Sequence, residues 1–323
     1  MTRFWFLVSL YLPVSTVAFL GSKGLSIQST PKDSQNLDDY ASASSSITTV
    51  YMSQTHSSSS DFCTIIGGNG RIGSLLAQGS GPSLLIGRGE SIPSEPQGTP
   101  IFIATRNDSL HSIIDACPNN RKADLVFLQN GYLDAFLQSK GLADNTQALL
   151  YLSVPAKGVP PVDGITSKNP QGLTSATGKH ASALAKRLQS LGLKCNVYTS
   201  MEKEYKPAMF EKLIWISTYM LVGTAKKCSS VGQAGDLYPS LVQSIIQELV
   251  QAVEKKEGIT FTSGTVPRLA AYTEVVKDFP CAVKEFEWRN EYFYKLGNDA
   301  CPIHNALLRE CRDLGLITFT LPF

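Results

Sequence analysis

Three glycines near residue 70 have the spacing of a loop that holds a dinucleotide. Residues 62–73 read FCTIIGGNGRIG, so a short apolar run is followed by Gly68-x-Gly70-x-x-Gly73 and then by a helical pattern. In such a loop the first glycine makes the tight turn, and the second lets the backbone approach a pyrophosphate. The third lets helix and strand pack closely, with the helix amino terminus facing the phosphates. The candidate cofactor contacts of this loop are Gly68, Asn69, Gly70, Arg71, Ile72 and Gly73. The spacing also occurs in turns that bind nothing, so the surrounding elements must support it.

Strand and helix patterns alternate around this loop, from residue 62 to residue 155. The expected strands are 62–66, 83–86, 100–104, 124–128 and 149–154, and the expected helices are 72–78 and 108–116. A helix over 175–191 and a strand over 196–199 close this part of the chain. Such alternation predicts an α/β fold with a doubly wound parallel sheet of the Rossmann type. It favours a ligand-binding loop over an empty turn.

The pattern becomes helical after about residue 203. We expect helices over 207–227, 241–254, 283–294 and 303–314. The predicted organisation is therefore a presequence (1–60), an NADP-binding Rossmann domain (61–203) and a helical substrate domain (204–323). The helical domain would close one side of the cofactor site and is a candidate dimer interface.

The end of the strand at 83–86 bears on the choice of cofactor. Sites that prefer NAD usually place an acid there for the ribose hydroxyls, whereas an arginine suits the 2′-phosphate of NADP. Here Arg88 follows the strand directly and Glu90 lies two residues further on. A guanidinium binds phosphate well in bidentate fashion, so we favour NADP (NADPH). The alternative is that Arg88 is a solvated loop charge.

Composition narrows the class of protein. The 323 residues carry a formal net charge of +2, which gives no electrostatic case for nucleic acid as the partner. Seven cysteines show no C-x-x-C spacing, and four histidines show no metal-binding spacing. We therefore expect reduced thiols, no metal, and a small molecule as the ligand.

The first sixty residues read as targeting sequence. Arg3 precedes an apolar run over 4–20 that suits a signal-peptide core better than a membrane anchor, because Pro13 interrupts it. A tract rich in Ser and Thr follows over 21–60. A signal core followed by a transit-like segment resembles the bipartite presequence of algae with complex plastids. We expect a plastid location with no membrane segment in the mature form; secretion is the alternative.

Three further segments resemble the ketopantoate reductases, in the order and at about the separation of that family. They are Gln129-Asn130-Gly131 after the strand at 124–128, Met209-Phe-Glu-Lys212-Leu213 at the start of the long helix, and Lys284-Glu285-Phe-Glu-Trp-Arg-Asn290. With the glycine loop, the resemblance covers about residues 62–315. It implies a Rossmann-type domain followed by an all-helical domain of the 6-phosphogluconate dehydrogenase-like type.

The resemblance also implies roles for particular residues. Lys212 would be the general acid, Glu285 would help to bind the substrate, and Asn130 would lie near nicotinamide and substrate. A shift of two residues in the match would put Glu287 in place of Glu285. Outside this resemblance Lys212 reads as an exposed helix charge, and Glu285 reads as a surface residue.

Reduction of a 2-keto acid suits such residues. It needs a hydride from the nicotinamide and a proton for the forming alkoxide. A lysine near desolvating walls has a lowered pKa and can deliver that proton. Arg106, after the strand at 100–104, could meet a phosphate or the substrate carboxylate, or could be a surface charge.

One departure from the family concerns the helix of Lys212. The family has asparagines four and eight residues after the lysine, where this chain has Ile216 and Met220. Loss of those polar contacts leaves three alternatives open. The first is an NADPH-dependent reductase of a 2-keto acid or related ketone. The second is another hydroxyacid dehydrogenase of the same superfamily. The third is a non-catalytic dinucleotide-binding protein that has lost its substrate site.

Overall fold

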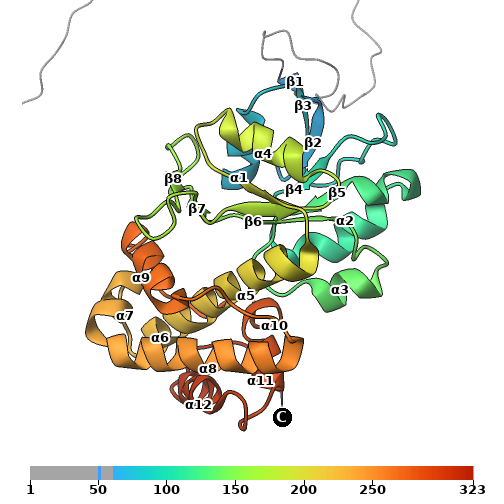
Figure 1. The fold of residues 1–323 in the computed structure, drawn as a ribbon. Helices are drawn as coiled ribbons and strands as arrows, with labels where there is room; N and C mark the ends of the chain where they lie inside the picture. Colours follow the sequence, from blue (N-terminus) through green and yellow to red (C-terminus); the bar gives the residue numbers. More distant parts are fainter. Residues whose placement is uncertain (1–49, 52–60, 323) are drawn as a thin grey trace, which may run out of the picture. The chain divides into compact units, whose positions relative to one another are not determined.

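The first half of the chain builds one mostly parallel sheet (Figure 1). The computed structural model describes residues 50–51 and 61–322. The signal core, and all of the Ser/Thr-rich tract except residues 50–51, lie outside the described residues. The strands of the sheet are β1 (Val50–Tyr51), β2 (Cys63–Ile66), β3 (Ser83–Ile86), β4 (Ile101–Ile103), β5 (Leu125–Phe127), β6 (Thr146–Leu149), β9 (Ser175–Thr177) and β10 (Asn196–Tyr198). β1 falls within the segment assigned to the presequence, yet it pairs with β3.

The strand order is β1-β3-β2-β4-β5-β6-β9-β10. β2 pairs in parallel with β3 and β4, and the parallel pairing continues through β5 to β6. β1 and β9 run antiparallel to β3 and β6, respectively. The chain therefore adds β3 on one side of β2 and then β4 on the other side, so the strand order reverses at β2. The carboxyl ends of β2, β4, β5 and β6 share one edge. In open α/β sheets, ligands bind at such a switch point.

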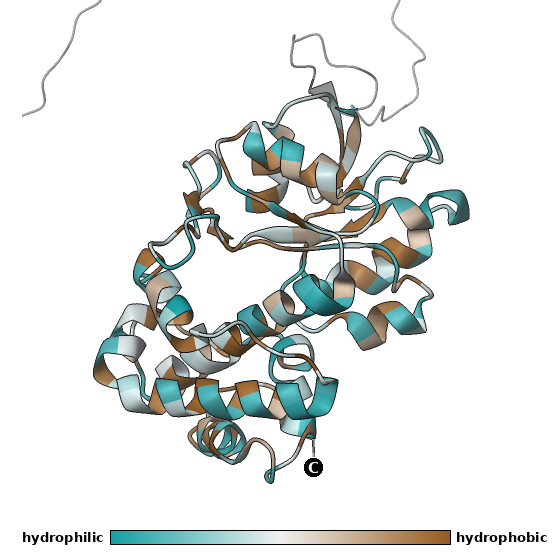
Figure 2. Cartoon of the chain, in the orientation of Figure 1, coloured by the Kyte–Doolittle hydropathy of each residue, from teal (hydrophilic) through white to brown (hydrophobic). Residues whose placement is uncertain are grey.

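Helices cover both faces of this sheet. They are α1 (Arg71–Ala77), α2 (Leu110–Ala116), α3 (Asp134–Ser139) and α4 (Ala181–Gln189), with short 3₁₀ turns at η2 (Asn107–Ser109) and η3 (Asn119–Asp124). Ile65, Phe102 and Val126 pack in one cluster with α1 and α4. The neighbouring residues Ile103 and Phe127 pack in a second cluster with α2 and α3. Figure 2 shows the resulting apolar strands between helices whose outer faces are polar. The doubly wound α/β fold is confirmed.

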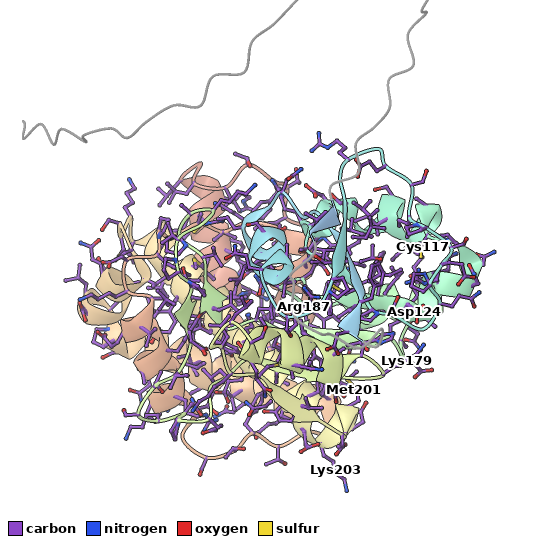
Figure 3. All side chains as sticks on the ribbon, turned by 90° about the horizontal axis from the view of Figure 1, so that it is seen from above. Cys117, Asp124, Lys179, Arg187, Met201 and Lys203 are labelled. Atoms are coloured by element: carbon purple, nitrogen blue, oxygen red, sulfur yellow. The ribbon has the colours of Figure 1, made fainter. Side chains whose placement is uncertain are left out.

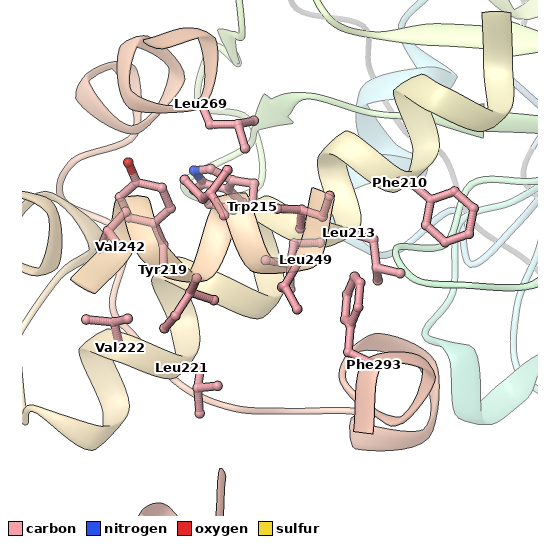
Figure 4. Packing of buried hydrophobic residues seen from close by; sticks show 14 of the residues in the cluster. Phe210, Leu213, Trp215, Tyr219, Leu221, Val222, Val242, Leu249, Leu269 and Phe293 are labelled. Carbon is pink, nitrogen blue, oxygen red and sulfur yellow. The ribbon is translucent and has the colours of Figure 1, made fainter. Parts of the chain in front are cut away.

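The second half of the chain is helical, and it belongs to the same compact unit as the sheet. Its elements are η4 (Met201–Tyr205), α5 (Lys206–Trp215), η5 (Ile216–Met220), α6 (Leu221–Ala225), α7 (Val231–Leu237), α8 (Pro239–Glu257), α9 (Thr265–Val275), α10 (Phe286–Arg289), α11 (Glu291–Lys295) and α12 (Pro302–Asp313). α5 packs against β6 as well as α8, so it links the sheet to the helical core. Figure 4 shows that core, where Leu213 and Trp215 of α5 meet Leu249 of α8 and Leu269 of α9.

Local sequence explains the limits of the longest helix. α8 begins at Pro239, whose fixed φ suits a first helical turn. It ends at Gly258, which has a left-handed φ of 67° that glycine adopts without a Cβ clash. Between these ends Val242, Ile245 and Leu249 face the core at helical spacing.

Two sequence predictions in the sheet were wrong. The strand expected over 149–154 is β6, which ends at Leu149, followed by a separate hairpin of β7 (Leu152–Ser153) and β8 (Val162–Asp163). The strand was missed because its buried residues include Thr146 and Gln147, which do not read as an apolar run. The helix expected over 175–191 begins only at Ala181, because Ser175–Thr177 is β9, an inner strand of small residues.

Two helix predictions also differ from the structure. The segment expected as one helix over 283–294 is irregular up to Glu285, which has a left-handed φ of 50°, and it then divides into α10 and α11. The helix expected over 207–227 starts earlier, at Met201, and contains two π-helical turns, η4 and η5. π-Helical turns inside longer helices are often found at functional sites.

A charged cluster ties the start of β5 to the start of α4, away from the carboxyl edge of the sheet. Asp124 accepts hydrogen bonds from Arg121 and Lys179, each at 2.8 Å, and contacts His180 at 3.1 Å. Figure 3 labels Asp124 and Lys179 of this cluster. Burial raises the pKa of Asp124, but hydrogen bonds from Lys179, Arg121, the Gly98 amide and His180 lower it to about 2. The buried charge of Asp124 is therefore compensated by residues that connect β5 to α4.

All seven cysteines are free thiols. Among residues 50–51 and 61–322, every helix is too short or too polar to cross a membrane.

Candidate active site

Lys212 reaches the carboxyl edge of the sheet from the helical region. It lies on α5, and its Nζ donates a hydrogen bond of 2.5 Å to the backbone carbonyl of Leu150, the residue directly after β6. Its exposed fraction is 6%, and among the described residues it is the only buried lysine. The expectation of an exposed helix charge is therefore wrong for this residue.

An aromatic ring lies over the ammonium group and belongs to a set of packed rings. Nζ lies 4.6 Å from the centre of the Tyr151 ring, and that ring packs edge-on against Tyr272, as does Trp215. Burial, with a smaller contribution from the nearby positive charge of Arg289, lowers the pKa of Lys212 to about 7. A lysine in this state holds a proton that it can release near neutral pH.

Glu285 lies in the same region, although it does not contact Lys212 directly. Its carboxylate forms an ion pair with Arg289, one turn further along α10, and both side chains are largely buried. Glu287, the other candidate, is exposed and accepts a hydrogen bond from Trp288 Nε1 at 2.8 Å. Of the two glutamates, only Glu285 pairs with the arginine whose charge affects Lys212.

The helix that follows Lys212 presents little polarity. Ile216 is 4% exposed and belongs to the helical core, and Met220 packs against that core. Both positions lie in the π-helical turn η5, which inserts about one extra residue and shifts the face presented after Lys212. Ser217 is the polar residue of this turn that makes a contact, because its Oγ donates to the backbone carbonyl of Arg289 at 2.9 Å. The buried Thr218 hydroxyl has no protein partner among the described residues.

The segment Gln129-Asn130-Gly131 joins the end of β5 to α10. Gln129 donates to the carbonyls of Ile103 and Thr105, at 2.9 and 3.1 Å, and so fixes the loop beside β4. Gly131 has a φ of 124°, and a Cβ there would lie 2.4 Å from the carbonyl oxygen of Trp288. The amide of the next residue bonds to that same oxygen at 2.7 Å. Asn130 is thus half-buried at the junction between the sheet and the Glu285 segment.

The glycine loop follows β2 at the same edge of the sheet. The glycine spacing predicts the tight turn at Gly68, but the left-handed residue of this turn is Gly67, with a φ of 82°. A Cβ on Gly73 would lie 2.2 Å from the carbonyl oxygen of Gly67, so only glycine allows α1 to pack this closely on the strand end. Asn69, Gly70 and Arg71 are exposed, Ile72 is half-buried, and no side chain caps α1.

Two other candidate cofactor residues lie on the loops after β3 and β4. Arg88 is exposed beyond β3 and has no side-chain partner among the described residues, whereas the Glu90 carboxylate accepts a 2.6 Å hydrogen bond from the amide of Gly87. Arg106 has a side chain that is 76% exposed and lies 3.3 Å from Asp108. Arg71 donates to the carbonyl of Val154 at 3.1 Å beside a small cavity of about 120 Å³.

The structure therefore brings the sequence candidates to one edge in two groups. The glycine loop and Arg88 lie at β2 and β3, and Lys212, Asn130 and Glu285 lie at the ends of β5 and β6. Sequence reasoning missed Leu150, Tyr151 and Arg289. Arg289 lies inside the quoted segment 284–290, so its charge was a signal that could have been read. The contact with Leu150 joins residues 62 positions apart and leaves no local pattern.

Comparisons with solved structures reproduce this architecture. A ketopantoate reductase from Ralstonia eutropha JMP134 aligns with a TM-score of 0.55 and 16% identity, covering 78% of this chain and 98% of its own. The 2-dehydropantoate 2-reductase of Methylococcus capsulatus gives 0.56 and 13%, covering 80% and 98%. A D-mandelate dehydrogenase solved with NADH and anilino(oxo)acetate gives 0.56 and 13%, covering 79% and 99%.

No protein-family model matches the chain, and no curated protein matches its sequence. The structural likeness establishes the fold: a Rossmann-type domain followed by a helical domain, as in ketopantoate reductases.

Proposed function

We propose that this protein is an NADPH-dependent reductase that converts a 2-keto acid or related ketone to the hydroxy compound, in the manner of the ketopantoate reductases. The observation that carries the proposal is Lys212. A buried lysine with a pKa of about 7 lies at the carboxyl edge of a Rossmann-type sheet, the edge on which the glycine loop also opens.

The residues of the glycine loop fit a dinucleotide. Gly67 and Gly73 pack closely and have no side chains, which leaves the backbone open where a pyrophosphate would approach it. α1 has only seven residues, so the exposed residues 69–71 would contribute more than the helix dipole. Gly68 to Gly73 would hold the pyrophosphate, and the unpaired guanidinium of Arg88 would hold the 2′-phosphate. Arg106 would assist only after leaving Asp108.

The bound cofactor would supply a hydride to the carbonyl carbon of the substrate. Lys212 in its ammonium form would stabilise the negative charge that develops on the carbonyl oxygen and would then give that oxygen a proton. Asn130 and Glu285 would orient the substrate from the β5 loop and from α10. The aromatic wall of Tyr151 and Tyr272 would keep water from the ammonium group.

A second candidate function rests on a specific observation. Lys212 is hydrogen-bonded to Leu150 and covered by Tyr151, and Glu285 is already paired with Arg289. A protein that binds a dinucleotide without catalysis would have such a closed site. Catalysis requires Lys212 to direct another N–H of its ammonium group at the carbonyl oxygen of the substrate.

The test is NADPH oxidation by the purified mature chain, followed at 340 nm, with a panel of 2-keto acids and neutral ketones. Turnover with at least one ketone supports the reductase. Tight NADPH binding by calorimetry without turnover of any ketone would support the binding protein instead. Absence of both binding and turnover would reject both candidates. We also propose a plastid location and a homodimer; fluorescence of a tagged full chain and light scattering test these two points.

A further inference from the structure

Arg289 places an additional positive charge beside Lys212. Its backbone carbonyl accepts the hydroxyl of Ser217 at 2.9 Å, so α10 is held against the helix that carries Lys212. Its guanidinium contributes to the lowered pKa of Lys212. The side chain is 17% exposed, which leaves a small part of it open to a ligand. Two cations therefore share this region.

The anionic groups around these cations do not balance them. Glu285 is the carboxylate that pairs with Arg289, and Glu287 points instead to the indole of Trp288. Arg268 on α9 neutralises Glu211, the neighbour of Lys212 on α5. With Lys212 protonated, the cluster of Lys212, Arg289 and Glu285 carries one net positive charge, which favours an anionic ligand.

The hydrogen bonds of Arg289 are also incomplete. Its Nη2 reaches Glu285, but its Nε is buried and has no partner among the described residues. A buried donor without an acceptor destabilises the fold, because it has lost its hydrogen bond to water. The Nε–H and one Nη–H of a guanidinium form a fork that matches the two oxygens of a carboxylate.

We propose that Arg289 binds the carboxylate of the substrate, through a fork that includes Nε, and so restricts the enzyme to 2-oxo acids. This inference rests on the proposed reductase function and narrows its substrate from ketones in general. Arg289 would supply the polar contact that the helix of Lys212 lacks at Ile216 and Met220. The substrate carboxylate would neutralise the net positive charge of Lys212, Arg289 and Glu285. It would also keep Lys212 protonated until its proton is transferred to the carbonyl oxygen.

The experiment compares a 2-oxo acid with its own methyl ester, which is similar in shape but neutral. We expect Arg289→Met to lower kcat/KM for the acid about a hundredfold and to change that for the ester less than about threefold. Arg289→Lys, which keeps the charge but loses the fork, should fall between these values for the acid. Lys284→Met removes an exposed positive charge from the same segment and should leave both substrates unchanged.

Two further measurements test carboxylate binding by Arg289 separately from the proposed reductase activity. Oxamate, a carboxylate probe that is not reduced, should bind the wild-type NADPH complex in calorimetry and should bind Arg289→Met at least about tenfold more weakly. The double variant Glu285→Gln/Arg289→Met should bind oxamate as weakly, and it controls for the carboxylate left without its cation. Thermal melts verify that each variant is folded.

The outcomes are distinct. If the wild type reduces acid and ester equally well, or if Arg289→Met slows both equally, the reductase stands and the role of Arg289 is wrong. If no ketone is reduced but oxamate binding depends on Arg289, the anion site stands and the reductase is wrong. If the wild type neither reduces a ketone nor binds oxamate, both are wrong.

Discussion

The glycine loop at β2 and the Lys212 region at β6 lie on one edge of one sheet but are built in different ways. The loop is made of backbone: Gly67 supplies a left-handed φ, and Gly73 allows an approach that no side chain permits. Its side chains at 69–71 are exposed. The Lys212 region is made of buried charged and aromatic side chains that contact one another. A cofactor shared by many enzymes needs only the first kind of site, whereas a particular substrate needs the second.

The largest expected effect tests the backbone construction of the loop. Gly73→Ala places a Cβ 2.2 Å from the Gly67 carbonyl oxygen and 2.8 Å from the Gly68 Cα, and neither backbone atom can move away cheaply. We expect a loss of about 3 kcal/mol or more in the free energy of unfolding, measured by urea denaturation, together with loss of NADPH binding.

A matched control is Gly235→Ala. This glycine is also helical, in α7, but its Cβ would meet only Tyr219 Cε1, at 3.4 Å. Alanine there should leave stability unchanged or raise it by up to about 1 kcal/mol. Equal stability losses in the two variants would show that the loop has no special steric demand.

The next effect tests whether the Lys212 region sacrifices stability for a buried charge. Burial lowers the pKa of Lys212 from 10.5 to about 7, so between these values the unfolded chain holds more protons than the folded one. The wild type therefore gains stability as pH rises from 7 to 9. Lys212→Met lacks this cost and should be more stable by about 2–4 kcal/mol at pH 7, after allowance for its lost hydrogen bond and aromatic contact.

The stability gain should decrease towards pH 9 and should level off below pH 7. Thermal melts from pH 6 to 9 measure it. The control is Lys206→Met on the same helix, where the pair with Glu257 raises the pKa of the lysine despite partial burial. That variant should lose up to about 1 kcal/mol. A stability loss in Lys212→Met at every pH would mean that Lys212 is structural.

The smallest effect sharpens the chemistry of the loop after β3. Arg88→Ala should weaken NADPH binding about tenfold and should leave NADH binding unchanged, because only NADPH carries the 2′-phosphate. Glu90→Gln should strengthen NADPH binding slightly: it removes a negative charge, and the amide oxygen can still accept the Gly87 hydrogen bond. An unchanged preference in Arg88→Ala, measured by calorimetry, would contradict the assignment of NADP.

The same contrast explains what could be predicted from sequence. The Rossmann-type sheet was predictable because β2, β4 and β5 are short apolar runs, and because the glycine spacing depends on local sterics. β6 and β9 were misjudged because they contain the buried polar residues Thr146, Gln147 and Ser175. A hydropathy pattern does not recognise such segments as inner strands. The division of segment 283–294 into two short helices was not predicted, because a left-handed φ is unusual for a glutamate and nothing in the sequence indicates it at Glu285.

At the candidate site, sequence identified Lys212 and Glu285 by resemblance but did not reveal their partners. Tertiary packing brings Leu150 and Tyr151 into contact with Lys212, and it brings the charge of Arg289 close enough to affect the pKa of Lys212. Ile216 is buried in the helical core and Met220 packs against it, so neither position offers a polar contact. The π-helical turn at η5 shifts the face they occupy, so the four-and-eight spacing of an ordinary helix does not apply there.

The central claim is that Lys212 delivers the proton in a ketone reduction. Its most direct test is kcat for NADPH oxidation with the best 2-oxo acid of the panel, in wild type and in Lys212→Met. We predict a wild-type kcat/KM that falls as pH rises above about 7, when Lys212 of the free enzyme loses its proton. We also predict a loss of at least about a hundredfold in the kcat of the variant, with NADPH binding retained. Equal values of kcat in the two proteins would contradict the account.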